Sequence, residues 1–158
     1  MTQNPAKISK GSRYHQGYYK CTNPDKYMGD PNKILYRSSW ERKVCFKLDH
    51  AEYVIGWGCE TFSINYISPK DGLPHRYFPD FIVVTFDKIN SKKIVTVIEV
   101  KPHKEQFPPS SKGKKKSRYL SECLTYSINQ AKWNTAKDFC NKKGWNFLVL
   151  TEKEILSK

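Results

Sequence analysis

Two carboxylates and one lysine fall at the ends of two neighbouring predicted strands. Asp80 follows Pro79 in one apolar segment, and Glu99 and Lys101 stand two residues apart at the end of the next. Alternate side chains of a strand point to the same face, so Glu99 and Lys101 share a face. If the two strands form a hairpin, Asp80 lies beside Glu99. The sequence therefore predicts two acidic groups and one ammonium group at one end of a sheet.

This grouping is typical of a site for a divalent cation. Two neighbouring buried carboxylates are costly because each is desolvated and each repels the other. Carboxylate oxygens suit Mg²⁺, with Mn²⁺ as the expected substitute. We predict that Asp80 and Glu99 bind the metal, which activates water for phosphodiester hydrolysis, and that Lys101 assists at the phosphate. A plain ion pair between Glu99 and Lys101 on an edge strand is the alternative.

A further carboxylate, Glu41, lies three residues after Ser38 at the start of a predicted helix. The Ser-x-x-Glu spacing is itself the pattern of a capping box, and spacing alone favours that structural role. The functional alternative is a carboxylate on the helix that reaches the metal site directly or through water.

The charge of the chain points to a polyanionic partner. There are 28 Lys and Arg against 15 Asp and Glu, for a net charge of +13, and nucleic acid is the polyanion that most often neutralises such an excess. A hydrophobic content of 38% is too high for a disordered chain, and no apolar run is long enough to span a membrane. Residues 1–10 contain no apolar core of a signal peptide, so we expect a cytoplasmic protein. Five cysteines without a Cys-x-x-Cys pair predict neither a disulfide framework nor a zinc site.

Two segments combine basic residues with irregular structure. Residues 1–36 mix lysine, arginine and tyrosine between Asn-Pro and Asp-Pro turns, which predicts an arm whose tyrosines either stack on bases or cover the core. Residues 102–118 predict a Lys-rich loop. We expect contacts with the DNA backbone from six basic residues of this kind: Arg37, Lys104, Lys112, Lys114, Lys115 and Lys116. Gln130 and Lys132, on a later helix, are either further DNA contacts or part of a solvated face.

The periodicity predicts the elements that position these residues. A helix is expected over 38–51 and ends before Gly56 and Gly58 break the pattern. Strands are expected over 62–66, 77–86, 94–101 and 145–150, with a loop over 69–76 and a helix over 119–143 that Gly144 ends. A short helix follows Thr151. The predicted class is α/β of the α+β type: a mixed four-stranded sheet flanked by helices in a single domain, 37–158, after the arm.

The pattern Glu41, Pro79-Asp80, Glu99-x-Lys101 resembles the PD-(D/E)xK nuclease superfamily over residues 38–150. The resemblance implies a restriction-endonuclease-like core. It also implies that Asp80, Glu99 and Glu41 form the metal site and that Lys101 assists catalysis.

A closer likeness extends through the arm. The segments Asn23-Pro24-Asp25-Lys26-Tyr27, Gly29-Asp30-Pro31, Tyr36–Glu41 and Gln130–Trp133 are similar to the head-completion nucleases of large contractile-tailed phages. The likeness implies a magnesium-dependent endonuclease that cuts or trims packaged double-stranded DNA in the infected host cell or on the virion. Portal or neck proteins are the implied partners. A junction-resolving or transposon-end endonuclease, or a non-catalytic DNA-binding head-closure protein, are the alternatives, and the sequence leaves the oligomeric state open.

Overall fold

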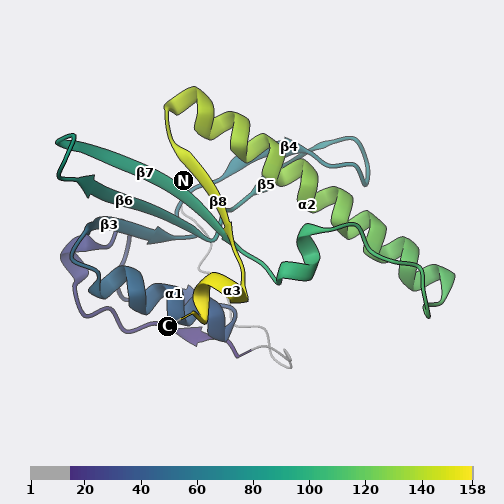
Figure 1. Cartoon of the computed structure of the whole chain (residues 1–158), viewed down its shortest axis with the longest axis horizontal. Helices are drawn as coiled ribbons and strands as arrows, with labels where there is room; N and C mark the ends of the chain where they lie inside the picture. Colours follow the sequence, from purple (N-terminus) through teal and green to yellow (C-terminus); the bar gives the residue numbers. More distant parts are fainter. Residues whose placement is uncertain (1–14, 158) are drawn as a thin grey trace.

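The computed structural model describes residues 15–157, which are built around a four-stranded sheet (Figure 1). Its strands are β3 (Val54–Cys59), β6 (Phe81–Asp87), β7 (Lys92–Val100) and β8 (Asn146–Leu150), in the order β3-β6-β7-β8. The first three pair antiparallel, and β8 joins β7 in parallel. The predicted mixed four-stranded sheet is therefore confirmed.

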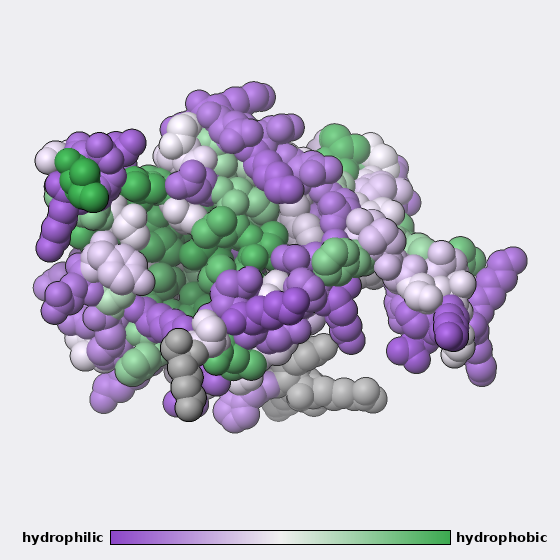
Figure 2. Space-filling model, viewed as in Figure 1, coloured by the Kyte–Doolittle hydropathy of each residue, from purple (hydrophilic) through white to green (hydrophobic). Residues whose placement is uncertain are grey.

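Helices cover both faces of this sheet. On one face, α1 (Ser39–His50) and α3 (Glu152–Ile155) pack against the main core, which includes Trp57 and Phe81, both 0% exposed. On the other face lies α2 (Lys116–Lys143), whose buried Cys140 packs with Val97. The chain from the end of β7 at Val100 to the end of α2 at Lys143 forms the crossover that a parallel neighbour requires. Figure 2 shows an apolar area over the middle strands, bordered by hydrophilic residues.

The ends of the helices follow their sequence signals. The hydroxyl of Ser38 accepts the backbone N–H of Glu41 at 3.1 Å, as expected of an N-cap. Gly144 ends α2 with a φ of +68°, a conformation that glycine adopts without strain. Thr151 and Glu154 form the predicted capping box of α3. The start of α2 lies at Lys116, three residues before the expected position. No helix among residues 15–157 is long and apolar enough to cross a membrane.

Within the four-stranded sheet, the strand that the sequence did not predict is β3. Gly56 and Gly58 were expected to interrupt regular structure, but both lie in this strand. Each glycine leaves room for a neighbour: a Cβ on Gly58 would lie 2.6 Å from the Thr61 hydroxyl, and one on Gly56 would lie 3.1 Å from the sulfur of Met28. The glycines of this strand therefore serve close approach by the preceding arm and the following loop.

The strand expected over 62–66 is not part of the four-stranded sheet, because residues 64–66 lie in a separate two-stranded sheet. Here β4 (Ile64–Ile67) pairs with β5 (Pro74–Tyr77), which occupies part of the segment expected to be a loop. The prediction that 77–86 forms one strand is also wrong, because Tyr77 ends β5 and a new strand begins at Phe81. The break has a physical cause in the buried Pro79, which has no N–H for a sheet ladder.

The described part of the arm packs on the core. It contains β1 (Gly17–Tyr18), the short helix η1 (Pro24–Lys26) and β2 (Leu35–Tyr36). Tyr19 and Tyr27 contact the ring of Trp57 edge-on, with centroids 6.1 and 4.8 Å apart. For these two tyrosines the structure supports the alternative that they cover the core. The basic residues of the arm before position 15 lie outside the described residues.

Candidate active site

Asp80 and Glu99 are brought together by the hairpin of β6 and β7. Phe81 pairs with Ile98 in the antiparallel register, so Asp80 and Glu99 come next to each other at the end of the ladder. The Asp80 carboxylate accepts the backbone N–H of Val100 at 2.7 Å, and its carbonyl oxygen accepts the N–H of Glu60 at 3.0 Å. The side chain and the backbone carbonyl of Asp80 are thus both held by hydrogen bonds, which orients the second carboxylate oxygen.

Glu99 lies between a lysine and a tyrosine. Its side chain is 6% exposed, and the ammonium nitrogen of Lys101 lies 3.5 Å from Oε1. The hydroxyl of Tyr77, at the end of β5, donates a hydrogen bond to Oε2 at 2.6 Å. Sequence reasoning missed Tyr77 because it treated this residue as an ordinary strand former. Its position three residues before Asp80, at the break before β6, was the available signal.

The electrostatics of the two carboxylates show mutual repulsion. Burial, followed by the charges of Glu99 and Glu41, raises the pKa of Asp80 well above its usual range. Burial alone would lower the pKa of Lys101, but Glu99 and Asp80 outweigh it and raise that pKa. A fixed cation is therefore held beside two acids that cost energy to ionise together.

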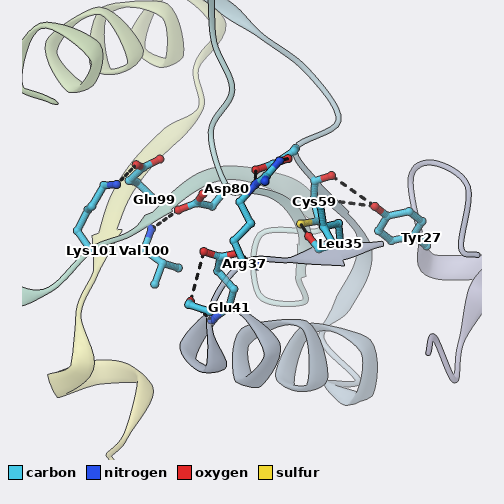
Figure 3. Close-up of polar contacts among 11 residues, drawn as sticks. Tyr27, Leu35, Arg37, Glu41, Cys59, Asp80, Glu99, Val100 and Lys101 are labelled. Carbon is cyan, nitrogen blue, oxygen red and sulfur yellow. Dashed lines mark hydrogen bonds and ion pairs between the residues drawn. The ribbon is translucent and has the colours of Figure 1, made fainter. Parts of the chain in front are cut away.

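Glu41 faces this pair from α1, and Figure 3 shows Asp80 between Glu99 and Glu41. The Glu41 carboxylate accepts the backbone N–H of Arg37 at 2.7 Å and the hydroxyl of Ser38 at 3.3 Å. Burial and the nearby Glu60 raise the pKa of Glu41, against the effect of the hydrogen bond from Arg37. The capping role is therefore real, and the same side chain also adds negative charge at Asp80.

Arg37 and Glu60 form a second layer around the site. The Arg37 guanidinium lies 3.0 Å from Oε1 of Glu60, so the side chain that we predicted to contact DNA is held in an ion pair. Glu60 adopts a φ of +50°, which is unusual for a residue with a Cβ. This conformation places its N–H on the Asp80 carbonyl. The sequence gives little sign of such a residue, because backbone strain depends on tertiary contacts.

Lys132 approaches the site from α2. Its ammonium nitrogen lies 5.7 Å from the ring centroids of both Tyr66 and Tyr77, which is within the range of a cation–π contact. Burial lowers the pKa of Lys132, and the charges of Glu99 and Asp80 act in the opposite direction. The ring of Tyr77 thus contacts Lys132 while its hydroxyl holds Glu99. Gln130 is half-buried on the same helix.

The remaining predicted DNA contacts lie on or beside the segment before α2. Lys104 lies in the short helix η2 (His103–Gln106), and Lys112 is exposed in the loop that follows. Lys114 forms an ion pair with Glu122. Lys115 is the N-cap of α2 and Lys116 its first residue, and both are exposed.

The oxygen donors fit a cation that is only partly enclosed by protein. Among residues 15–157, no three acidic, histidine or cysteine side chains are grouped as a ready-made metal site. Mg²⁺ is commonly held by one or two carboxylates together with water and substrate phosphate, and does not need a full protein cage. The adjacent Asp80 and Glu99 provide such a pair, and their repulsion is what a divalent charge would relieve.

Comparisons with known proteins place the chain in a family. Residues 51–152 match the model described as TnsA-like endonuclease N terminal, a segment that contains Asp80, Glu99 and Lys101 but not Glu41. The chain is also 37% identical over 142 residues to a protein of Enterobacteria phage T4 named "Head completion nuclease", covering 87% of this chain and 91% of the relative. Both findings confirm the resemblance drawn from the motifs. The chain therefore belongs to the TnsA-like endonucleases of the PD-(D/E)xK type.

Proposed function

We propose that this protein is a divalent-metal-dependent endonuclease that hydrolyses phosphodiester bonds of double-stranded DNA during phage head completion. The observation that carries the proposal is the pair of Asp80 and Glu99, with Lys101 3.5 Å from Glu99, at the end of the β6–β7 hairpin. A buried acid with a raised pKa beside a fixed cation, as at Asp80, is characteristic of catalytic sites. The net charge of +13 supports DNA as the substrate.

Each residue has a separate task in this proposal. Asp80 and Glu99 hold Mg²⁺, or Mn²⁺ in its place, and the cation supplies charge neutralisation and an acidified water. Lys101 is held beside Glu99 and stabilises negative charge that develops on the phosphate. Glu41, on α1, adds negative charge near Asp80 or contacts a water molecule bound to the cation. Lys132, Gln130 and the basic residues at 37, 104, 112 and 114–116 bind the DNA backbone.

The biological step is proposed from the named relative. A protein called head completion nuclease aligns over 91% of its own length and 87% of this chain, so we assign the same step to this chain. The DNA would be packaged phage DNA, and portal or neck proteins would be the partners that bring the enzyme to it. We expect the enzyme in the host cytoplasm or attached to the virion.

The test is cleavage of supercoiled and linear double-stranded DNA by the purified protein with Mg²⁺, with Mn²⁺ and with EDTA. We expect nicking or cutting with either metal and none with EDTA. A protein that binds DNA but cuts it under none of these conditions would instead be the non-catalytic head-closure protein. Faster cutting of branched DNA than of linear DNA of the same sequence would favour a junction-resolving enzyme.

Replacing Tyr77 with phenylalanine should weaken metal binding without destroying the site. The variant keeps the ring that contacts Lys132 but loses the hydroxyl that orients Glu99. Loss of such a supporting hydrogen bond typically costs about 10- to 100-fold in metal affinity. We expect the Mg²⁺ concentration for half-maximal cleavage to rise by about this factor, with most of the rate recovered at saturating Mg²⁺. An unchanged metal dependence would show that Tyr77 does not position Glu99.

A further inference from the structure

A groove runs between the segment after β7 and the first half of α2. It has a volume of about 520 Å³, and both of its walls come from segments that extend beyond the sheet (Figure 1). Residues 104–110 form one wall, and α2 residues from Arg118 to Asn129 form much of the other. The volume is within the range of sites that hold one small organic group. None of the roles assigned above to the carboxylates uses this groove.

Both walls of the groove belong to segments that lead to the candidate active site. On one wall, Lys104 and Glu105 follow the catalytic Lys101 by three and four residues, and the charge of Glu105 acts on the pKa of Lys101. On the other wall, Tyr126 and Asn129 line the groove, and Lys132 follows at the same spacing of three along the helix. Residues three apart lie on one face of a helix. A strand leaving the carboxylates between Lys101 and Lys132 would enter this groove.

The chemistry of the walls suits an unpaired nucleotide. Phe107, which is 54% exposed, and the half-buried Tyr126 offer aromatic surfaces. Lys104, Lys114 and Arg118 supply three cations against the carboxylates of Glu105 and Glu122. Aromatic rings next to cations in a groove are the usual means of binding single-stranded nucleic acid, whose bases are free to stack. The bases of an intact duplex stack on each other and are not available to such a groove.

The ion pairs inside the groove do not oppose this use. Glu122 contacts both Lys114 and Arg118, and the Arg118 side chain is 72% exposed. The ion pair of this exposed arginine contributes little to stability and is readily exchanged. One carboxylate shared by two cations also leaves positive charge for a phosphate.

We propose that the groove binds a single-stranded segment of DNA that continues from the bond to be cut. The substrate is then a duplex with a single-stranded tail, and the cut falls at or near the point where the strands separate. This inference rests on the proposed nuclease function and specifies the DNA that the enzyme prefers.

The test compares three substrates of the same duplex sequence: one is blunt, one has a single-stranded 3′ tail and one has a single-stranded 5′ tail. We expect wild type to cut one tailed form at least tenfold faster than the blunt form. Replacing Tyr126 with alanine should slow cutting of that form by about ten- to a hundredfold, the usual effect of losing one base stack. Cutting of the blunt duplex should change little. Phe107→Ala, at an exposed site that tolerates truncation, should act in the same direction.

The matched control is Tyr53→Ala, an exposed tyrosine just before β3 that does not line the groove. It should cut all three substrates as wild type does. Equal rates of wild type on blunt and tailed DNA would overturn the inference. Equal slowing of the blunt and tailed substrates by Tyr126→Ala and Phe107→Ala would also overturn it.

A binding measurement separates this inference from the proposed function. Asp80→Asn, which should not cut, is titrated with a fluorescent oligothymidylate, and anisotropy is followed with and without the Tyr126→Ala change. Weaker binding of the double variant by at least tenfold supports the groove even if no DNA is cut under any condition, which would overturn only the nuclease function. Equal binding would overturn the groove even if duplex DNA is cut.

Discussion

Replacing Asp80 with asparagine should lower the rate of DNA cleavage by about a thousandfold or more, which corresponds to ~4 kcal/mol of transition-state stabilisation. The substitution keeps the shape of the side chain, and the amide oxygen can still accept the N–H of Val100. What it removes is the charge that would hold the cation. Without the cation, neither water nor phosphate is activated, so the loss should appear in the rate at every DNA concentration.

The same variant should be at least as stable as wild type in the absence of metal. The raised pKa of Asp80 means that its ionised form is disfavoured in the folded protein, chiefly by burial and then by Glu99 and Glu41. Removing that charge relieves the repulsion. Thermal unfolding tests this directly: Mn²⁺ should raise the Tm of wild type and should have little effect on Asp80→Asn.

Asp138→Asn is the matched control, because Asp138 is an exposed aspartate on α2. It should cut DNA and respond to Mn²⁺ as wild type does. Retained cleavage by a well-folded Asp80→Asn variant would remove Asp80 from the metal site. A variant that neither folds nor cuts would be replaced by Glu99→Gln, for which the same loss of cleavage is expected.

The pair of Asp80 and Glu99 was accessible from the sequence because its geometry depends only on local rules. The alternation of side chains along a strand aligns Glu99 with Lys101, and the short turn after β6 makes a hairpin the simplest connection. The apolar character of residues 94–98 indicated an interior strand, and β7 does lie between β6 and β8. These inferences require no knowledge of distant contacts.

The residues that surround Asp80 and Glu99 could not be predicted from the sequence in the same way. Tyr77 reaches Glu99 from a separate two-stranded sheet, and Glu60 contacts Asp80 through a strained backbone. Both depend on where segments meet in three dimensions, which periodicity does not reveal. The missed β3 has a related cause: its glycines weaken the strand pattern, and their purpose is visible only once Met28 and Thr61 are seen against them.

Glu41 illustrates why the two interpretations of one motif need not compete. Its spacing from Ser38 predicts a cap, and the resemblance of the motifs implies a place near the metal. The structure contains the Ser38 N-cap hydrogen bond and also brings the carboxylate close enough to Asp80 to raise its pKa. Anchoring by the cap restricts the side chain, and a restricted carboxylate is a better contributor to a metal site than a mobile one.

The arm is attached to this helix through one buried acid, and its replacement gives the largest expected loss of stability. Asp49, near the end of α1, is 0% exposed, and its carboxylate accepts the backbone N–H groups of Thr22 and Asn23 and the hydroxyl of Tyr19, at 2.8 to 2.9 Å. Asp49→Ala would leave these three donors without their acceptor. We expect the free energy of unfolding to fall by about 3–5 kcal/mol, measured by urea denaturation at neutral pH.

The effect of pH provides the sharper form of this prediction. Burial alone would raise the pKa of Asp49, but the hydrogen bonds from Thr22, Tyr19 and Asn23 outweigh it and hold the pKa below its ordinary value. A group whose pKa is lower in the folded protein stabilises it above the unfolded pKa, about 3.9, and this contribution is lost as the pH falls through the folded pKa. The gap in unfolding free energy between wild type and Asp49→Ala should therefore be constant from pH 7 to about 5 and narrow below about 4. Asp138→Ala, on the exposed face of α2, should change the unfolding free energy little. A gap that did not narrow at low pH would mean that Asp49 holds the arm through its shape and not through its charge.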